Sequence, residues 1–440
     1  MPKGPRKFQF LLGAHGLTRF GGLSLFSYFC KSLRLRYFLQ HSVRWPAYYH
    51  RAYHPADLFM AHLFAILAGI GRIENTQSLM HNGLVPPLLG LPEFPHRDTL
   101  RTFLWRFDKG TLGSLRAAHD KLRAEFFKRL KILYSATIDC DTTTLTVFGR
   151  QESTEIGFNR KYRGKRSYAP ILSSEGKSGL SLGMELRAGN VDASTGALIF
   201  LRQMLEKLPS SIAASRTRLR LDGAFYDKDI LLPIEEDGYG YVCVADMTGP
   251  LVREMVAAKY HEFAKGWEAA EFTYTPFHWK EKHRFAAVRR PLSLESEKLK
   301  ESLFSFKKYT YHRALVHNLA LEPESVWRSY TDRANQELLI REFKDSFFMA
   351  KIPTRSFWAN AAYMEMILWA YDLALAFQNL CLPEEVRHWN ISTLRRELWW
   401  IPANWIKRGS RNVLLLPEKY PHHALLLKIQ KAASRIKPLI

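Results

Sequence analysis

Four polar residues recur on one side of a predicted helix close to residue 337. The segment "YTDRANQELLIREFK" has apolar residues at helical spacing, and at about 100° per residue Tyr330, Arg333, Glu337 and Lys344 fall within a sector of about 60°. The apolar sector can pack, which leaves the polar sector facing a groove. A plainer interpretation is a solvated face with helix-spaced ion pairs, Arg333 to Glu337 and Glu337 to Arg341.

Aspartates lie in or directly after two predicted strands. In "ATIDCDTTTLTV" the β-formers predict a strand, and Asp139 and Asp141 are two residues apart, so both point to one face. In "RTRLRLDGAFYDKD" a second strand ends at Asp222, and the carboxyl end of a strand is where open α/β sheets hold their sites. In the structural alternative, Asp222 caps a turn, and Asp139 or Asp141 pairs with an arginine such as Arg220.

Two such aspartates and a helix-borne glutamate would supply hard oxygen ligands for Mg²⁺ or Mn²⁺. Two ions about 3.5 to 4 Å apart would activate an attacking oxygen and stabilise a leaving oxygen in an in-line phosphoryl displacement. The residue types therefore indicate metal-dependent chemistry on a phosphate ester.

The composition favours a polyanionic partner. The chain of 440 residues has 64 lysines and arginines against 42 acidic residues, a formal net charge of +22, and we expect nucleic acid ahead of membrane. It contains no run of eighteen apolar residues, which predicts a soluble, cytosolic protein without a membrane partner. The four cysteines are far apart, so neither a disulfide framework nor a zinc site is indicated.

A basic loop follows the first acidic strand. The segment "NRKYRGKRSY" carries five cations, Arg160, Lys161, Arg163, Lys165 and Arg166. Next to a metal site such a loop could clamp phosphates, whereas in the plainer interpretation it is a solvated turn.

Secondary-structure signals divide the chain into helical ends and a β-rich middle. Strands alternate with helices from residue 134, which indicates an α/β sheet, and further strands follow after residue 239. The apolar segment "WANAAYMEMILWAYDLALAFQNL", which begins at residue 358, holds Asp372 and is interpreted as a buried core helix. We predict a helical N-terminal region at 1–130, an α/β region at 131–238 and 321–380, a β-rich region at 239–320 and a basic helical C-terminal region at 381–440.

The spacing Tyr330, two residues, Arg333, three residues, Glu337, six residues, Lys344 resembles the Y-R-E-K signature of bacterial insertion-sequence transposases of the DDE type. Other segments agree in order, among them "DTT" at Asp141, "LRAGN", "RLDGAFY" and "TLRRELWWIPANWIKRGSRNVLLLP". The resemblance is to the subgroup whose first motif is D-x-D-x-T, and it covers nearly the whole chain, to about residue 420. It implies that 131–238 and 321–380 form one core, that 239–320 is an insertion in it and that 1–130 binds DNA.

The resemblance implies an RNase H-like catalytic core, a mixed sheet flanked by helices, with Asp141, Asp222 and Glu337 as ligands of two Mg²⁺ or Mn²⁺ ions. Tyr330, Arg333 and Lys344, with Arg341 nearby, would hold the phosphate backbone of DNA, and Asp139 would be a neighbour of Asp141 or its substitute. In related transposases an aromatic residue of the insertion receives a flipped base, and Trp279 in "FHWKEKHR" is the corresponding expectation; the alternative is a tryptophan packed in a β core.

The same resemblance implies cut-and-paste transposition in the bacterial cytoplasm, in association with the nucleoid. The enzyme would bind the terminal inverted repeats of its own element in double-stranded DNA, pass through hairpin ends and act as a homodimer. Two rival hypotheses are a metal-dependent nuclease without strand transfer and a domesticated DNA-binding protein that no longer cuts.

Overall fold

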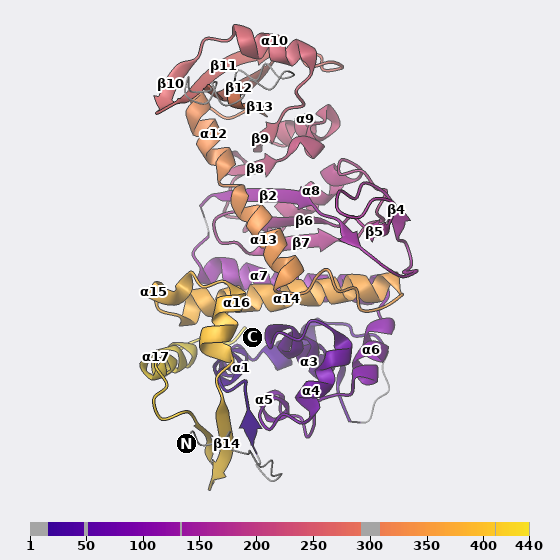
Figure 1. Ribbon diagram of the computed structural model, residues 1–440, viewed down its shortest axis with the longest axis vertical. Helices are drawn as coiled ribbons and strands as arrows, with labels where there is room; N and C mark the ends of the chain where they lie inside the picture. The colour runs from indigo at the N-terminus through magenta and orange to yellow at the C-terminus, as the bar shows by residue number, and fades with distance from the viewer. Residues whose placement is uncertain (1–15, 48–51, 133, 292–308, 410, 440) are drawn as a thin grey trace, which may run out of the picture.

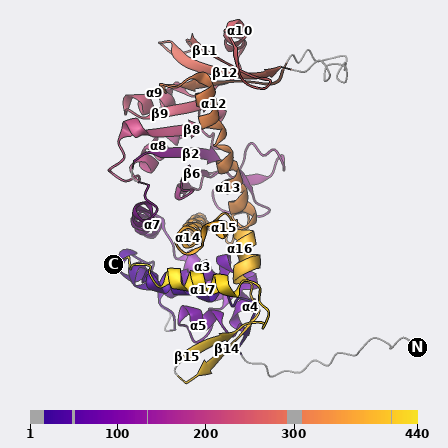
Figure 2. The same cartoon turned by 90° about the vertical axis from the view of Figure 1, so that its left-hand side faces the viewer.

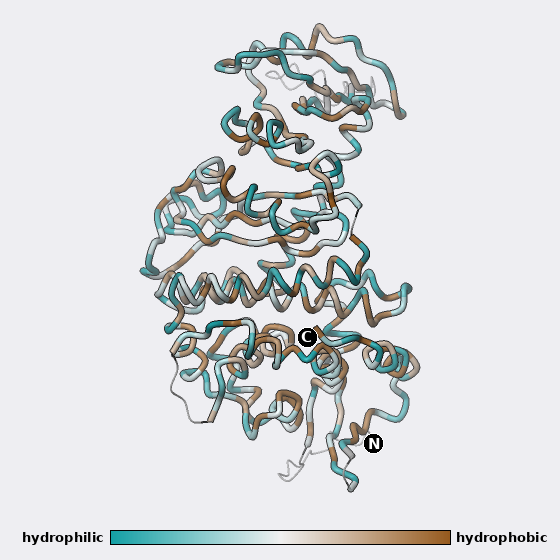
Figure 3. The backbone as a smooth tube through the Cα atoms, turned by 180° about the vertical axis from the view of Figure 1, so that it is seen from behind, coloured by the Kyte–Doolittle hydropathy of each residue, from teal (hydrophilic) through white to brown (hydrophobic). Residues whose placement is uncertain are grey.

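The computed structural model describes residues 16–47, 52–132, 134–291, 309–409 and 411–439. Along the long axis of the molecule, a helical region formed by both ends of the chain is followed by a large sheet and then by a β-rich tip (Figure 1). Hydrophobic residues recur through both the helical region and the sheet (Figure 3).

The sheet is mixed, and β2 (Ala136–Thr142) lies third from one of its edges. On one side β6 (Ile171–Glu175) and β7 (Ser181–Glu185) run antiparallel to their neighbours. On the other side β8 (Thr217–Leu221) and β9 (Gly240–Val244) run parallel to β2. The prediction of a mixed α/β sheet flanked by helices is confirmed.

The same sheet continues into the segment predicted as an insertion. Strand β13 (Tyr309–His317) pairs antiparallel with β9, and β12 (His283–Pro291), β11 (Trp267–Tyr274) and β10 (His261–Ala264) follow outward. Strand β9 lies inside the predicted insertion but pairs with the core strand β8. The sheet therefore crosses the boundary expected at residue 239, because sequence periodicity marks a strand without identifying its partner.

Helices cover both faces of the central strands. Helices α8 (Ala197–Leu205) and α9 (Lys228–Glu236) lie on one side, and α12 (Pro323–Thr331) and α13 (Ala334–Asp345) lie on the other (Figure 2). A short sheet of β3 (Leu145–Thr146), β5 (Arg166–Tyr168) and β4 (Glu155–Ile156) lies outside this layer.

Beyond β7, the long helices α7 (Lys109–Arg129) and α14 (Phe357–Cys381) separate the sheet from the terminal helices (Figure 1). Nearly all of α14 is buried, with Trp369 fully so, as predicted for a core helix. Among the described residues no helix is long and apolar enough to cross a membrane.

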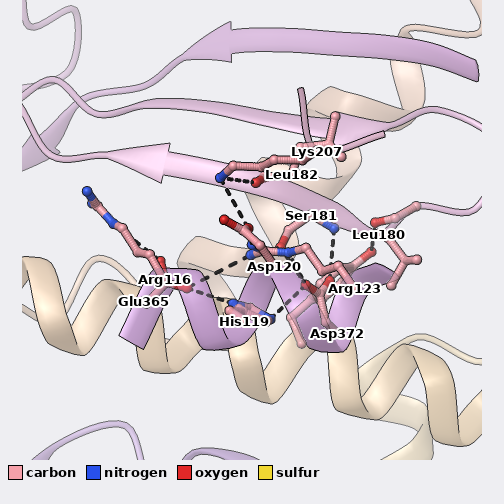
Figure 4. A network of polar contacts seen from close by, with 12 residues as sticks. Arg116, His119, Asp120, Arg123, Leu180, Ser181, Leu182, Lys207, Glu365 and Asp372 are labelled. Carbon is pink, nitrogen blue, oxygen red and sulfur yellow. Dashed lines mark hydrogen bonds and ion pairs between the residues drawn. The ribbon is translucent and has the colours of Figure 1, made fainter. Parts of the chain in front are cut away.

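Four charged residues join α7 to α14 inside the molecule, and we name His119, Arg123, Glu365 and Asp372 the α7–α14 cluster (Figure 4). His119 lies between two carboxylates, with Nδ1 2.6 Å from Glu365 Oε1 and Nε2 3.1 Å from Asp372 Oδ2. Arg123 Nε donates to Asp372 at 3.0 Å, and Ser181 on β7 donates to the same carboxylate through its backbone N–H and its hydroxyl. All four side chains are almost fully buried, so the cluster fastens the sheet to the helical layer.

The two ends of the chain meet in the helical region. The N-terminal part contributes α1 (Leu23–Ser32), α2 (Leu35–Ser42), α3 (Pro55–Leu67), α4 (Gln77–Met80), α5 (Val85–Leu89) and α6 (Arg97–Trp105). The C-terminal part contributes α15 (Glu384–Arg387), α16 (Ile391–Leu394) and α17 (His423–Ala433).

A β-hairpin lies within the C-terminal region that the sequence predicted as helical. Its strands β14 (Ala403–Arg408) and β15 (Arg411–Leu415) pair with each other, and β1 (Leu17–Thr18) pairs with β14. Because β1 comes from the other end of the chain, the third strand of this small sheet could not be read from the local sequence.

Candidate active site

Two aspartates meet where neighbouring parallel strands end. Asp141 is the penultimate residue of β2, and Asp222 follows β8 directly. Strands β2 and β8 are in parallel register, with Asp139 opposite Arg220, so Asp141 and Asp222 lie at the same edge of the sheet. Asp222 Oδ1 accepts a hydrogen bond from Ala224 N at 3.1 Å and caps the short turn Gly223–Phe225, as the structural alternative predicted.

Arg333 lies among the three carboxylates that the sequence singled out. Its Nη2 is 2.9 Å from Asp141 Oδ2 and 3.7 Å from Asp222 Oδ2, and its Nη1 is 3.8 Å from Glu337 Oε1. The guanidinium is 6% exposed, whereas the Glu337 side chain is 72% exposed. We name Asp141, Asp222, Arg333 and Glu337 the Arg333 cluster.

A break in the helix brings Arg333 inward. The sequence predicted one helix over residues 330–344, but α12 ends at Thr331 and α13 begins at Ala334. At the junction the N–H of Arg333 donates to Tyr330 O, and the N–H of Gln336 donates to Arg333 O. These bonds span three residues rather than four, which tightens the chain locally and alters the direction of the side chains.

The charges of the Arg333 cluster are only partly compensated. Burial raises the pKa of Asp141, Arg333 counteracts this, Asp222 and Glu337 raise it further, and the net value is about 6. Burial also raises the pKa of Asp222. Burial opposes the charge on Arg333, but the surrounding acidic groups, Asp141 first among them, raise its pKa overall. The two aspartates therefore share the guanidinium of Arg333.

Asp139 does not join the Arg333 cluster. Both of its oxygens accept from Arg220, at 2.6 Å each, and its side chain is 1% exposed. Arg220 also donates to Ser329 O at 3.0 Å, so it ties the end of α12 to the sheet. The pairing with Arg220 that the sequence left as an alternative is the one present, and it gives each oxygen of Asp139 a short bond to Arg220.

The remaining members of the signature surround this centre. Tyr330 is half-buried, and burial raises its pKa to about 12. Lys344 is half-buried near the end of α13; burial lowers its pKa, and both Asp141 and Lys161 are close enough to act on it electrostatically. Arg341 is exposed on the same helix.

The basic loop lies on the side of Lys344. Four of its cations, Arg160, Lys161, Arg163 and Lys165, are exposed. Arg166 differs, because it belongs to β5 and its guanidinium bonds to Thr154 O and to Glu155. The loop therefore presents a free basic surface held at its base by Arg166.

Trp279 is half-buried at the turn between β11 and β12. It stacks on Tyr226, with ring centroids 5.7 Å apart, and meets His283 edge-on at 4.6 Å. Because Tyr226 follows the turn after Asp222, Trp279 reaches the segment that carries a site aspartate. Trp279 therefore packs against other rings, as in the core interpretation, and stays partly exposed, as stacking on a base would require.

A second set of aromatic rings near the site was not singled out in the sequence. Trp327 on α12 stacks beside Tyr330 at 6.3 Å and beside Trp267 at 6.1 Å, and lies 5.1 Å from Tyr311. A spacing of three residues between Trp327 and Tyr330 is the signal that could have found it, because such residues share a helix face.

The donor chemistry of the Arg333 cluster fits a divalent metal ion. Three carboxylates converge on one cationic group, and carboxylate oxygens are the preferred protein ligands of Mg²⁺ and Mn²⁺. Among the described residues, no three acidic, histidine or cysteine side chains are spaced to hold an ion, and Arg333 contacts all three of these carboxylates.

Residues 12–438 match the family described as Transposase DDE domain group 1. The chain belongs to this family. The match confirms the prediction of a DDE transposase. Comparison with curated proteins finds no match. Among solved structures the chain is similar to the piggyBac transposase in a synaptic complex with hairpin DNA, with 9% identity, 88% of this chain and 82% of that chain covered, and a TM-score of 0.44.

Proposed function

We propose that this transposase binds the terminal inverted repeats of its own insertion sequence and catalyses metal-dependent strand cleavage and strand transfer. The observation that carries the proposal is the convergence of Asp141, Asp222 and Glu337 on one point at the carboxyl ends of two parallel strands. In this proposal strands β7, β6, β2, β8 and β9 form the RNase H-like core of a bacterial enzyme of the Y-R-E-K group.

Each carboxylate has a separate role in holding the reaction centre. Asp141 and Asp222 stand on strand ends of a rigid sheet, so they define fixed ligand positions, whereas the exposed Glu337 on α13 completes the set from the opposite side. Two Mg²⁺ or Mn²⁺ ions, when bound, would activate the attacking oxygen and stabilise the leaving oxygen. Asp139 orients Arg220 and the end of α12 rather than binding an ion.

The cations around the centre position the DNA. Tyr330, Arg333 and Lys344 would contact the phosphates next to the cleaved bond, and Arg341 and the exposed cations of the basic loop would extend this surface. Trp279 would stack on a base turned out of the duplex at a hairpin end. Two protomers would pair two transposon ends.

Incubation of the full chain and its Glu337→Gln variant with labelled DNA from the element's ends, plus Mg²⁺ or Mn²⁺, tests the proposal. Denaturing gels should show nicks, hairpins and joined products with the wild type only. Cleavage without any joined product identifies a nuclease that lacks strand transfer. Specific binding of the ends with no cleavage by either protein identifies a DNA-binding protein that no longer cuts.

A further inference from the structure

The guanidinium of Arg333 occupies the place where the three carboxylates could share a metal ion. It makes one short contact, 2.9 Å to Asp141, and two longer ones to Asp222 and Glu337. Nη2 also donates to Cys140 O at 3.4 Å. An arginine side chain stays charged at every accessible pH, so this cation cannot leave the centre by losing a proton.

We propose that Arg333 is an internal counter-ion that keeps divalent metal out of the site until its guanidinium leaves the carboxylates and binds a DNA phosphate. The proposal rests on the function proposed above and specifies the order of binding, with DNA before metal. Two cations at this point would repel each other at short range, and both would compete for Asp141 Oδ2, which already contacts Arg333 Nη2. Metal binding therefore requires Arg333 to move away.

The contacts of Arg333 are those of a group that can change partners. Among the described residues, its Nε is buried without a hydrogen-bond partner, so the planar fork of donors is incompletely used. Arg220 offers the contrast in the same chain, because both of its contacts to Asp139 are 2.6 Å long and bidentate. A phosphate binds a guanidinium through two parallel hydrogen bonds, which is a better match than the single short contact that Arg333 has here.

The position of Arg333 in the backbone gives it freedom to move. It is the N-cap of α13, at the junction where α12 ends, and its side chain makes no hydrogen bond to the capped helix. Residues at element ends absorb backbone changes more readily than residues inside a helix. Docking of DNA against Tyr330 and Lys344 would bring a phosphate to this junction, and the transfer of Arg333 to it would free Asp141 and Asp222.

Binding of Mn²⁺ to the DNA-free full chain, followed by electron paramagnetic resonance, tests the proposal without relying on activity. The Arg333→Gln variant should bind Mn²⁺ at least about 10-fold more tightly than the wild type, a change of ~1.4 kcal/mol. The gain should vanish when Asp141→Asn is added. Lys344→Gln removes the same charge close to Asp141 without touching the carboxylates, and we expect its Mn²⁺ affinity to stay within about 3-fold of the wild type.

Equal Mn²⁺ affinities of the wild type and the Arg333→Gln variant, or equal gains for Arg333→Gln and Lys344→Gln, would overturn the proposal. If the glutamine variant does not fold, Arg333→Met replaces it, since methionine also removes the charge, and the absence of any gain then overturns the proposal as well.

A matched measurement on the wild type bound to a duplex from the element's end separates this inference from the proposed function. Mn²⁺ binding that depends on Asp141 in the DNA complex, with no gain in the DNA-free Arg333→Gln variant, leaves the function standing and removes the counter-ion role. The absence of Asp141-dependent Mn²⁺ binding in every state removes both.

Discussion

Two clusters in this chain place an arginine among carboxylates, and they differ in how completely their charges are balanced. In the α7–α14 cluster, Arg123 and His119 contact Glu365 and Asp372, and Ser181 adds two further hydrogen bonds. In the Arg333 cluster one guanidinium contacts three carboxylates, and only its contact with Asp141 is shorter than 3.7 Å among these three.

The pKa values of Glu365 in the first cluster and Asp141 in the second reflect this difference. Burial alone raises the pKa of Glu365, but the hydrogen bond and charge of His119, with Arg123 and Arg116, outweigh it and lower the pKa to about 2. The pKa of Asp141 is instead about 6, because burial and its acidic neighbours outweigh Arg333. Several short contacts to each carboxylate mark a cluster that holds the fold together, whereas a surplus of negative charge marks one that is ready to accept another cation.

The largest expected effect falls on activity at the Arg333 cluster. Asp222→Asn removes a charged ligand without changing the shape of the side chain, and we expect strand cleavage to fall at least about 1000-fold, or ~4 kcal/mol of transition-state stabilisation. Single-turnover cleavage of end DNA measures it. Asp237→Asn, at a surface ion pair with Arg202, is the control and should cleave at the wild-type rate.

The next largest effect falls on stability at the α7–α14 cluster. Asp372→Ala leaves Arg123 and His119 buried without their shared partner, and we expect a loss of about 3 to 5 kcal/mol in the free energy of unfolding. Urea unfolding measures it. Asp237→Ala should cost less than about 1 kcal/mol. A loss for Asp372→Ala as small as that of the surface pair would contradict the contrast drawn between the clusters.

As the pH rises, the contributions of Asp141 and Glu365 to the free energy of unfolding should change in opposite directions. The pKa of Asp141 is about 6 in the folded chain against 3.8 ordinarily, so between these values the folded state holds a proton that the unfolded state has lost. The free energy of unfolding therefore falls as the pH rises through this window, by up to ~3 kcal/mol. Asp141→Asn keeps the uncharged form and should exceed the wild type in stability above pH 6, but not below about pH 4, in metal-free urea unfolding.

The contribution of Glu365 to the free energy of unfolding rises with pH. Its folded pKa of about 2 lies below its ordinary 4.5, so its stabilising contribution is complete above pH 4.5 and is lost as the pH falls toward 2. The free-energy difference between the wild type and Glu365→Gln should therefore shrink as the pH falls below 4.5. The same slope for both variants would show that the two clusters do not differ in charge balance.

The smallest effect concerns the basic loop. Lys161→Gln should weaken binding of end DNA a few-fold and reduce the salt dependence by about one counterion, without changing stability. Fluorescence anisotropy over a range of salt concentrations measures it. Lys128→Gln, an exposed lysine on α7 paired with Glu125, is matched in charge and should leave the salt slope unchanged.

The sequence by itself determined the elements that carry the chemistry. The β-formers around Asp141 and before Asp222 predicted the two strands, and the alternation of strands and helices predicted the mixed α/β sheet, because local periodicity reports which face of an element is buried. The spacing of Tyr330, Arg333, Glu337 and Lys344 led to the transposase family, which the family match confirms. The roles of these four residues stay predictions.

Only the tertiary structure decided which charges meet. The sequence predicted that Asp139 and Asp141 lie on one face. The parallel register of β2 with β8 sets Asp139 opposite Arg220, with which it pairs, whereas Asp141 contacts Arg333. His119 and Glu365, 246 residues apart, form a cluster that no local pattern announced. Such pairings depend on strand register and on helix packing across the whole chain. The helix predicted over residues 330–344 is interrupted between Thr331 and Ala334, and Arg333 at this junction contacts the three carboxylates.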